Sequence, residues 1–240
     1  MTRRRWIADE ISGNRAALTG KHARHLSQVL RVQVGQEFDI STGTEVRCGR
    51  VAVIQPDRVE LELGEIVFHS SMPPITVALS IFKFDRMEWA IEKCTELGVA
   101  RIVPVIAGRT DSHLGDAAIK RVERWRRIAK QASEQSRRVS PPDILDPSEF
   151  EDLLTMNAEA RIVLSEVEEQ VSLQNAVPQN ATSLLIAVGP EGGWKEEELV
   201  QFNAAGWISA SLGDTILRSE TASIAAVSIA FSVLGSRCQP

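Results

Sequence analysis

Two short segments near the carboxyl end of the chain carry residue types suited to holding a small molecule. The first is Gly189-Pro190-Glu191-Gly192-Gly193, which follows the apolar stretch Leu184 to Val188. Ligands of open α/β sheets bind beyond the carboxyl ends of strands, and glycines let backbone N–H groups approach a ligand without a Cβ in the way. Glu196 to Glu198 open the next predicted helix, which makes its start a poor phosphate site. A ligand-binding loop and a plain tight turn fit these five residues equally well.

The second segment runs from Leu212 to Ala222 and also lies between a predicted strand and a predicted helix. Ser219 is placed to cap that helix, while Arg218 and Glu220 are charges in a stretch that is otherwise mostly small or apolar. Taken alone, this segment favours a capped helix with a surface ion pair, which contributes little. Because both segments follow strands, however, two glycine-containing loops can converge on one small molecule.

Several other chemistries find no support in the sequence. The loops match neither the dinucleotide pattern G-x-G-x-x-G nor the phosphate loop that ends in Gly-Lys-Ser/Thr, and G-x-S-x-G is absent. His22 and His25 are three residues apart on a predicted helix, but no Cys or carboxylate cluster completes a metal site. We therefore predict no metal, a polar or RNA-facing role for the two histidines, and a core position for Cys94.

Composition indicates a folded protein without a membrane span. The chain has 240 residues, of which 43% are hydrophobic and 25% charged, and its formal net charge is -5. Apolar content at this level offsets the entropy of ordering the chain, and no apolar run reaches the roughly 20 residues that cross a bilayer. Three widely spaced cysteines, an odd number, favour reduced thiols and a cytoplasmic location over a disulfide framework.

Charge is distributed unevenly along the chain. Residues 1–50 hold nine basic and five acidic side chains, and residues 101–140 hold ten and four. Residues 141–200, in contrast, hold two and thirteen. A mildly acidic protein with two basic sections can still bind a polyanion, because phosphates respond to the local field.

The pattern of predicted elements changes near residue 70. The first 70 residues read as short β segments at 36–40, 47–54 and 58–63, with a short helix at 21–30, which is typical of a small barrel. A linker at 70–74 follows. Beyond it, strands alternate with helices, which predicts a parallel sheet covered on both faces, an α/β fold. The strands are expected at 75–82, 101–107, 161–165, 183–188 and 207–212, and the helices at 85–97, 116–138, 195–205 and 219–234.

Together, the two glycine-containing segments resemble the last third of the SPOUT methyltransferases, whose chain forms a deep trefoil knot around S-adenosylmethionine. The resemblance extends over nearly the whole chain and in order. Four further segments resemble the 16S ribosomal RNA uracil-N3 methyltransferases of the RsmE type: His25 to Val32 with Gly35, Phe84 to Val99, Pro104 to Arg109, and Ala132 to Arg138. One departure is Asp214-Thr215, where the family often has Gly-Pro-Arg. This change removes a positive charge from the loop, so a role for a basic residue there is not carried over.

The resemblance implies a PUA-like RNA-binding β-barrel over residues 1–70 and a SPOUT trefoil-knot domain with a mostly parallel sheet over residues 75–240. It implies a homodimer with each active site near the subunit interface. The uncharged stretch 221–234 fits that arrangement, although burial within one subunit fits it too. The implied reaction is S-adenosylmethionine-dependent methylation of N3 of uridine 1498 (U1498) in 16S rRNA, within an assembled or late-assembling 30S subunit.

The site residues follow from matching the motifs to this sequence. Arg218 is expected to stabilise charge on a uracil carbonyl oxygen, and Glu220 or Glu191 to orient Arg218 or accept the N3 proton. N3 lies on the Watson–Crick edge, so the target base must be unpaired or flipped out. The expected cofactor-binding residues are Leu164, Gly189, Glu191, Gly192, Gly193, Leu212, Gly213, Ile216, Leu217 and Thr221. The expected RNA-binding residues are Arg3, Arg4, Arg5, Lys21, Arg24, Arg31, Arg109, Arg124, Arg127 and Arg138.

Two other functions stay open on the sequence alone. One is a SPOUT methyltransferase that acts on another RNA site, for example on a ribose. The other is a non-catalytic RNA-binding or ribosome-assembly factor that has kept the fold. The intact segment Arg218-Ser219-Glu220-Thr221 argues against lost cofactor binding. For each basic residue taken singly, a solvated surface charge is the simpler interpretation.

Overall fold

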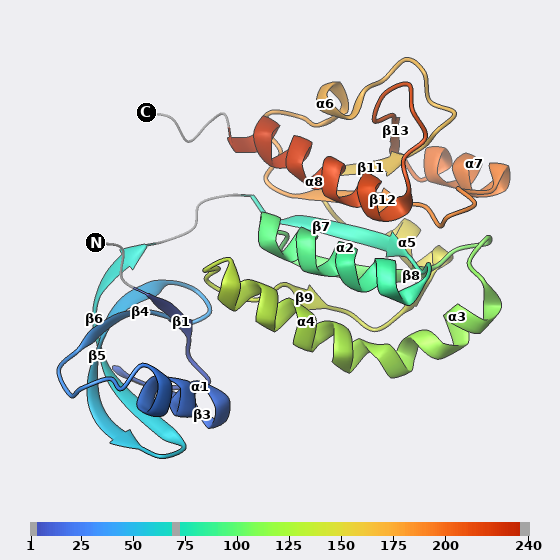
Figure 1. Cartoon of the computed structure of the whole chain (residues 1–240). Helices are drawn as coiled ribbons and strands as arrows, with labels where there is room; N and C mark the ends of the chain where they lie inside the picture. Colours follow the sequence, from blue (N-terminus) through green and yellow to red (C-terminus); the bar gives the residue numbers. More distant parts are fainter. Residues whose placement is uncertain (1–3, 69–72, 236–240) are drawn as a thin grey trace. The chain divides into compact units, whose positions relative to one another are not determined.

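The structure is a computed structural model that describes residues 4–68 and 73–235. It divides into two compact units, coloured along the sequence in Figure 1. The N-terminal unit comprises the chain up to Ser71 together with Ser133–Pro141, and the C-terminal unit comprises Met72–Ala132 and Pro142–Pro240. Ser133–Pro141, which the expected boundary at 70–74 leaves in the second domain, thus groups with the first unit.

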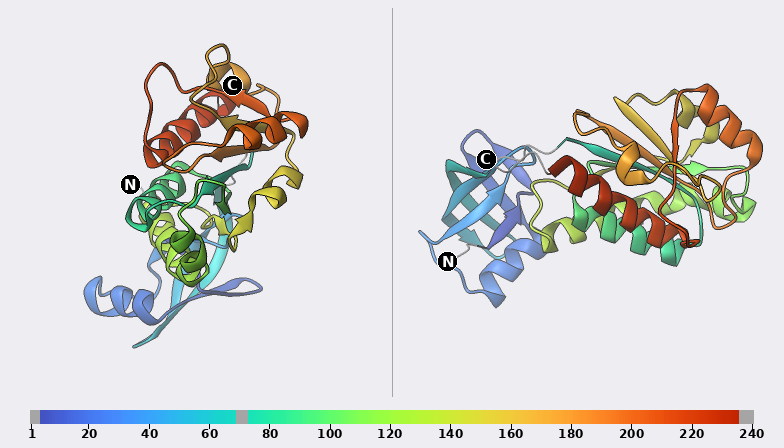
Figure 2. Two further views of the ribbon diagram at one scale, coloured as in Figure 1. Left: turned by 90° about the vertical axis from the view of Figure 1, so that its right-hand side faces the viewer. Right: turned by 90° about the horizontal axis from the view of Figure 1, so that it is seen from above.

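A curled six-stranded sheet forms the N-terminal unit (Figures 1 and 2). Its core holds the fully buried side chains of Leu18, Leu26, Ile40 and Leu61. All neighbouring strands are antiparallel except β1 and β4, in the order β1-β4-β5-β6-β3-β2. The strands are β1 (Arg5–Ile7), β2 (Glu10–Ser12), β3 (Arg15–Thr19), β4 (Glu37–Ser41), β5 (Val46–Gln55) and β6 (Arg58–Phe68).

Two parts of this unit differ from expectation. Strands β1, β2 and β3 were not expected, because three to five residues are too few to show a period of two. The helix expected at 21–30 is a short α-helix, α1 (Gly20–Arg24), followed by a π-helical turn, His25–Val29. The π-turn changes the angular spacing of side chains, so Leu26 is buried while Val29, which a regular helix would place on the same face, is 66% exposed.

A parallel sheet forms the centre of the C-terminal unit, in the order β10-β8-β7-β12-β11-β13, with β9 beside β8. Every strand pair in it is parallel. Leu184 to Val188 are buried throughout, as a strand with neighbours on both sides and helices on both faces must be. The strands are β7 (Ile75–Ser80), β8 (Arg101–Ile106), β9 (Asp143–Ile144), β10 (Ser148–Glu149), β11 (Ala160–Leu164), β12 (Leu184–Val188) and β13 (Ile208–Ala210).

Helices cover both faces of this sheet, as the alternation of elements predicts (Figure 1). Met87, Trp125 and Val227 pack on one face with Val77 and Leu79 of β7. On the other face, Ala78 of β7 packs with aromatic side chains such as Phe150 and Phe202. The first face carries α2 (Phe84–Leu97), α4 (Val122–Gln135), α6 (Leu173–Ala176) and α8 (Ser219–Gly235), and the second carries α5 (Phe150–Thr155) and α7 (Glu196–Ala204).

The helix expected as one piece at 116–138 is interrupted. The chain instead forms α3 (Ser112–Ala118), a 3-10 turn over Ile119–Arg121, and α4, which ends at Gln135 before Arg137 adopts a positive φ of 58°. The apolar residues Val122, Trp125, Ala129 and Ala132, which recur at helical spacing, are all buried. Within the described part of the chain, no helix is long and apolar enough to cross a membrane.

Candidate functional site

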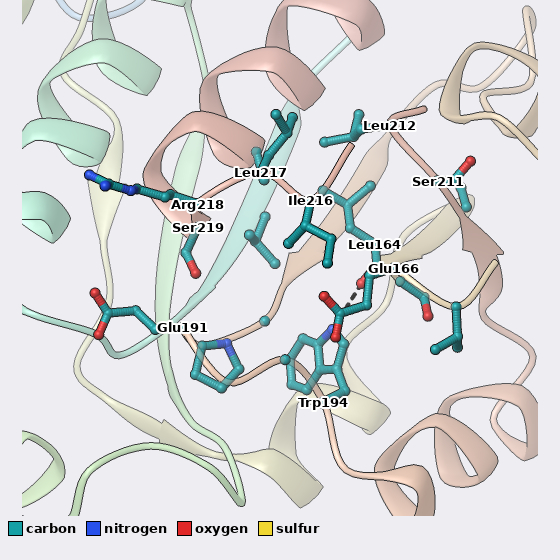
Figure 3. A pocket seen from close by; sticks show the side chains of 18 of the residues that line it. Leu164, Glu166, Glu191, Trp194, Ser211, Leu212, Ile216, Leu217, Arg218 and Ser219 are labelled. Atoms are coloured by element: carbon teal, nitrogen blue, oxygen red, sulfur yellow. Dashed lines mark hydrogen bonds between the residues drawn. The ribbon is translucent and has the colours of Figure 1, made fainter. Parts of the chain in front are cut away.

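The C-terminal unit contains a pocket of about 330 Å³ at the carboxyl ends of three neighbouring strands (Figure 3). Two loops form its walls. The glycine loop, Gly189–Trp194, follows β12, and the Leu212 loop, Leu212–Arg218, leads from β13 into α8. The third strand is β11, whose last residue, Leu164, lines the same pocket. The structure thus brings together the two segments that the sequence singled out.

Most of the expected cofactor-binding residues lie in this lining. Gly192 and Thr221 do not line the pocket, although each adjoins a residue or turn that does. The expected residues that do line it are Leu164, Gly189, Glu191, Gly193, Leu212, Gly213, Ile216 and Leu217, and Arg218 joins them. Glu220 lies outside the lining and is buried under the start of α8, with 5% of its surface exposed.

The glycine loop is a tight turn whose shape depends on glycine. The Gly193 N–H donates to the Pro190 carbonyl over 2.9 Å. Gly193 has a φ of +70°, and a Cβ there would lie 2.9 Å from a Glu166 carboxylate oxygen. Below the turn, the buried Trp194 indole donates from Nε1 to the Leu164 carbonyl over 3.0 Å (Figure 3). The loop is therefore fastened to the end of β11.

The Leu212 loop is more open. Gly213 has a φ of +114° with no atom within 4 Å of where a Cβ would stand. Ile216 is 82% exposed although it lines the pocket. Regular hydrogen bonding begins at the start of α8. There the Ala222 N–H donates to the Arg218 carbonyl over 2.8 Å, and the Ser223 hydroxyl donates to the Ser219 carbonyl over 2.6 Å.

Glu191 and Glu220, which were expected to orient Arg218, lie beside a different arginine. Arg86, on the first turn of α2, donates to the Glu191 carboxylate, and its Nε lies 3.8 Å from Oε1 of Glu220. The second oxygen of Glu220, Oε2, is buried without a hydrogen-bond partner among the described residues. Arg86 therefore joins α2, the glycine loop and the start of α8, and it takes the place beside Glu191 and Glu220 that we expected for Arg218.

Two charged side chains that line the pocket have no partner. The guanidinium of Arg218 and the carboxylate of Glu166 make neither a hydrogen bond nor an ion pair with any residue of 4–68 or 73–235. In Figure 3, the guanidinium of Arg218 and the carboxylate of Glu166 lie on opposite sides of the pocket. A ligand that enters here meets one basic and one acidic side chain, both exposed and neither paired within the described chain.

Sequence reasoning missed several lining residues, and the reasons differ. Ser165 and Glu166 follow β11, so the rule that ligands bind beyond strand ends was enough to nominate them. Trp194 follows the glycine loop directly and was within reach of the same rule. Arg86 had no such signal, because its place in the pocket depends on packing between α2 and α8, which are more than a hundred residues apart in sequence.

The expected RNA-binding residues of the N-terminal unit differ in how exposed they are and in whether they are paired with other residues. Arg3 lies outside the described residues. Arg5 is half-buried and donates to the Arg137 carbonyl over 2.5 Å, and Arg24 lies 3.4 Å from an Asp57 carboxylate oxygen. The exposed members of the set are Arg4, Lys21, Arg24 and Arg31.

The remaining basic residues are spread over several environments. Arg124 donates twice to Glu88, over 2.5 and 2.7 Å, which raises the pKa of its guanidinium. Arg127 is exposed. Arg138 is half-buried, and desolvation lowers its pKa to about 10, so we no longer expect it to contact phosphate freely. Arg109 points at the glycine loop, where its Nη1 donates to the Gly192 carbonyl over 2.6 Å.

His22 is held by two carboxylates instead of facing solvent. Its Nδ1 lies 2.9 Å from Asp9 and its Nε2 lies 3.0 Å from Glu134, with the indole of Trp6 packed against the ring. Hydrogen bonding to Glu134 and then to Asp9 raises the pKa of His22, although burial opposes this. Since both ring nitrogens face carboxylate oxygens, the site favours the doubly protonated imidazolium.

Comparison with known proteins places this geometry in a family. An RNA methyltransferase domain family matches residues 69–231. The ribosomal RNA small subunit methyltransferase E of Bacillus subtilis is 33% identical over 225 residues, which cover 88% of each chain. The protein of the same name from Aquifex aeolicus is 30% identical over 93% of this chain and 97% of its own.

A solved structure agrees with the sequence relatives. The ribosomal RNA small subunit methyltransferase E of Neisseria gonorrhoeae, bound to S-adenosyl methionine, superimposes with a TM-score of 0.83 at 31% identity, over 97% of this chain and 98% of that one. The fold class of the present chain, an α/β unit with a parallel sheet and a separate curled β-sheet, matches this structure and is the one expected from the sequence. The chain therefore belongs to the ribosomal RNA small subunit methyltransferase E family and is an S-adenosylmethionine-dependent RNA methyltransferase.

Proposed function

We propose that this protein methylates N3 of a uridine in 16S rRNA, at the position U1498, with S-adenosylmethionine as the donor. One observation carries the proposal: in a chain of this family, the two glycine-containing loops enclose a pocket beside an arginine that has no partner among the described residues. The arginine is Arg218, which lines the pocket, and its exposed guanidinium is available to a carbonyl oxygen of a bound base.

The lining of the pocket fits the donor. Apolar side chains from Leu164, Leu212 and Leu217 offer a place for an adenine ring, and the loop backbones offer N–H and C=O groups. Glu166, an acid without a partner in the described chain, suits the positive charge of a sulfonium. When bound, the donor supplies a methyl group activated by that sulfonium.

The residues around the pocket provide the remaining chemistry. Uracil N3 carries a proton and is a weak nucleophile, so the N3–H bond would break as N3 bonds to the methyl carbon, while the carbon–sulfur bond of the sulfonium breaks and leaves a neutral thioether. Arg218 stabilises the negative charge that develops on a uracil carbonyl oxygen. Glu191 lines the pocket and is placed to accept the proton, whereas the buried Glu220 holds Arg86, which in turn holds Glu191. No step requires a metal.

Basic residues supply the RNA contacts in this proposal. N3 is blocked in a paired base, so recognition rests on phosphates and on RNA shape around an unpaired or flipped uridine. The residues proposed for it are Arg3, Arg4, Arg5, Lys21, Arg24 and Arg31, with Arg124 and Arg127 on α4. The affinity for RNA should fall steeply with added salt, because each neutralised phosphate releases a counterion.

A homodimer is part of the same proposal. Half-buried apolar side chains lie along α8, among them Ile224, Ile229 and Phe231, and Trp89 on the adjoining α2 is 47% exposed. Apolar surface of this kind supports a contact between two copies of the chain. We place the dimer in the cytoplasm, where its substrate is an assembled or late-assembling 30S subunit.

The experiment that tests the function is mass mapping of methylated rRNA. Unmethylated 30S particles are incubated with the protein and S-adenosylmethionine, and the rRNA is digested and sequenced by mass. We expect one added methyl group, on N3 at U1498. A methyl group on a ribose or at another position would assign the enzyme to a different RNA site, and an absence of transfer together with no heat of donor binding would indicate a binding factor.

A further inference from the structure

The turn after β8, Ala107–Thr110, is attached to the outside of the glycine loop. Glu198 makes the first attachment: its Oε1 accepts from the Gly108 N–H over 2.8 Å, and its Oε2 accepts from the Lys195 N–H over 2.7 Å. Glu198 is 5% exposed, so both bonds are shielded from water. A buried carboxylate therefore ties the turn to the point where the glycine loop enters α7.

Arg109 makes the second attachment. Its Nη1 donates to the Gly192 carbonyl over 2.6 Å, and its Cδ lies 3.4 Å from where a Gly192 Cβ would stand. The arginine thus covers the glycine while it binds the carbonyl. Its own turn is braced, because the Ala107 N–H donates to the Thr110 hydroxyl over 3.0 Å and the Thr110 N–H to the Ala107 carbonyl over 2.9 Å.

Arg109 acts on the pocket without lining it. Gly193, the next residue, lines the pocket, and its hypothetical Cβ lies 3.9 Å from Nη1 of Arg109. Without the hydrogen bond from Arg109, two adjacent glycines can adopt many backbone conformations. A binding loop that must give up those conformations when the ligand binds has a lower affinity. A charged donor fixed on the carbonyl between them removes that freedom beforehand.

We propose that Arg109 is a positioning residue for the methyl donor, one that holds the Gly192–Gly193 backbone in the conformation that receives S-adenosylmethionine. This inference rests on the proposed placement of the donor in the pocket. It gives Arg109 a different role from the RNA contact expected from its position in the sequence. The role predicts a loss of donor affinity with RNA affinity retained, whereas a phosphate contact predicts the reverse.

The experiment measures S-adenosylmethionine binding by calorimetry on the full-length protein. R109A should bind the donor about tenfold more weakly than wild type, and R109K should fall between the two, because a lysine supplies a point charge in place of the arginine fork. R101A is the matched control: Arg101 is an exposed arginine at the other end of β8, paired with Asp143 over 3.4 Å, and its variant should bind like wild type.

Kinetics and stability separate positioning from a general structural role. With R109A, the KM for S-adenosylmethionine should rise about tenfold while kcat at saturating donor stays within about twofold of wild type. The thermal midpoint without donor should stay unchanged. R109A that binds the donor like wild type, that lowers the donor-free midpoint, or that loses RNA affinity instead would overturn the proposal.

One further variant separates the placement of the donor in the pocket from the positioning role of Arg109. Ile216 lines the pocket and is 82% exposed, so I216R adds a long positive side chain beside a cationic donor without disturbing a core. If I216R weakens donor binding and R109A does not, the pocket assignment stands and the role of Arg109 fails. If I216R binds the donor like wild type, the donor does not occupy this pocket, and both fail together.

Discussion

The two loops that wall the pocket are built in opposite ways. The glycine loop has three attachments. Its own Trp194 binds the Leu164 carbonyl, its Glu191 pairs with Arg86, and its Gly192 carbonyl accepts from Arg109. The Leu212 loop has open space around Gly213, and its Arg218 has no partner within the described chain. We infer that the first loop is prepared for the donor before binding, while the second keeps a charge available for the reaction.

The largest expected effect is on catalysis, from the open loop. R218A should lower kcat by about 10²- to 10³-fold, because removal of one donor to a developing oxyanion has an effect of this size. Donor affinity should stay close to that of wild type, since the other anchors of the pocket are intact. Single-turnover methylation of 30S particles measures the first and calorimetry the second.

R218K is the control for charge alone, and it should recover part of the rate, because it keeps the positive charge without the planar fork. A folded R218A variant with undiminished turnover would remove Arg218 from the mechanism and leave the open loop without its proposed function.

A pair of glycine variants compares the loops directly. Gly193 and Gly213 both have positive φ, so alanine at either should lower the free energy of unfolding by about 1–2 kcal/mol. Only at Gly193 does the new methyl group meet an atom, Oε1 of Glu166 at 2.9 Å. Because this oxygen ends an exposed, flexible side chain that can turn away, G193A should weaken donor binding by about fivefold, through the displaced carboxylate, whereas G213A should weaken it little. Equal losses of donor affinity in the two variants would contradict the difference between a prepared and an open loop.

A smaller effect is expected from the acid between the loops. Glu166 is exposed, so its interaction with a sulfonium is screened, and E166Q should lower the preference for S-adenosylmethionine over the demethylated product by about two- to fivefold. The two Kd values are measured by calorimetry in low salt. Wild-type preference in E166Q would show that the carboxylate does not sense the charge of the donor.

The smallest effect concerns His22, which belongs to the N-terminal unit, whereas both loops belong to the C-terminal unit. The pKa of His22 is raised above its ordinary value of 6.5 by Glu134 and Asp9. A raised folded-state pKa adds stability that is fully present below pH 6.5 and is lost as the pH rises through the folded value. The urea midpoint of wild type should therefore fall over that range more than that of H22Q. Donor affinity should not follow this change, and a shared pH dependence would count against the separation of the two effects.

Features set by neighbouring residues in the sequence could be predicted, whereas features set by tertiary packing could not. The glycine segments and the strands before them depend on neighbours in sequence, and both were predictable. The split of the helix at 116–138 was not, because a 3-10 turn of three residues leaves the apolar period nearly intact. The partner of Glu191 was not predictable either, since Arg86 reaches it only through the packing of α2 against the same pocket.

The sequence by itself determined the α/β class and the two glycine-containing loops that follow strands, because periodicity and turn chemistry are local properties. The methyl donor was implied by the resemblance of these segments to a known family. The tertiary structure alone decided which charges are paired. It assigned Arg86 to the two glutamates, Arg109 to the Gly192 carbonyl, and left Arg218 without a partner in the described chain. The physical reason is that a side chain's electrostatic partner is set by distance in space, which sequence spacing does not specify across a folded sheet.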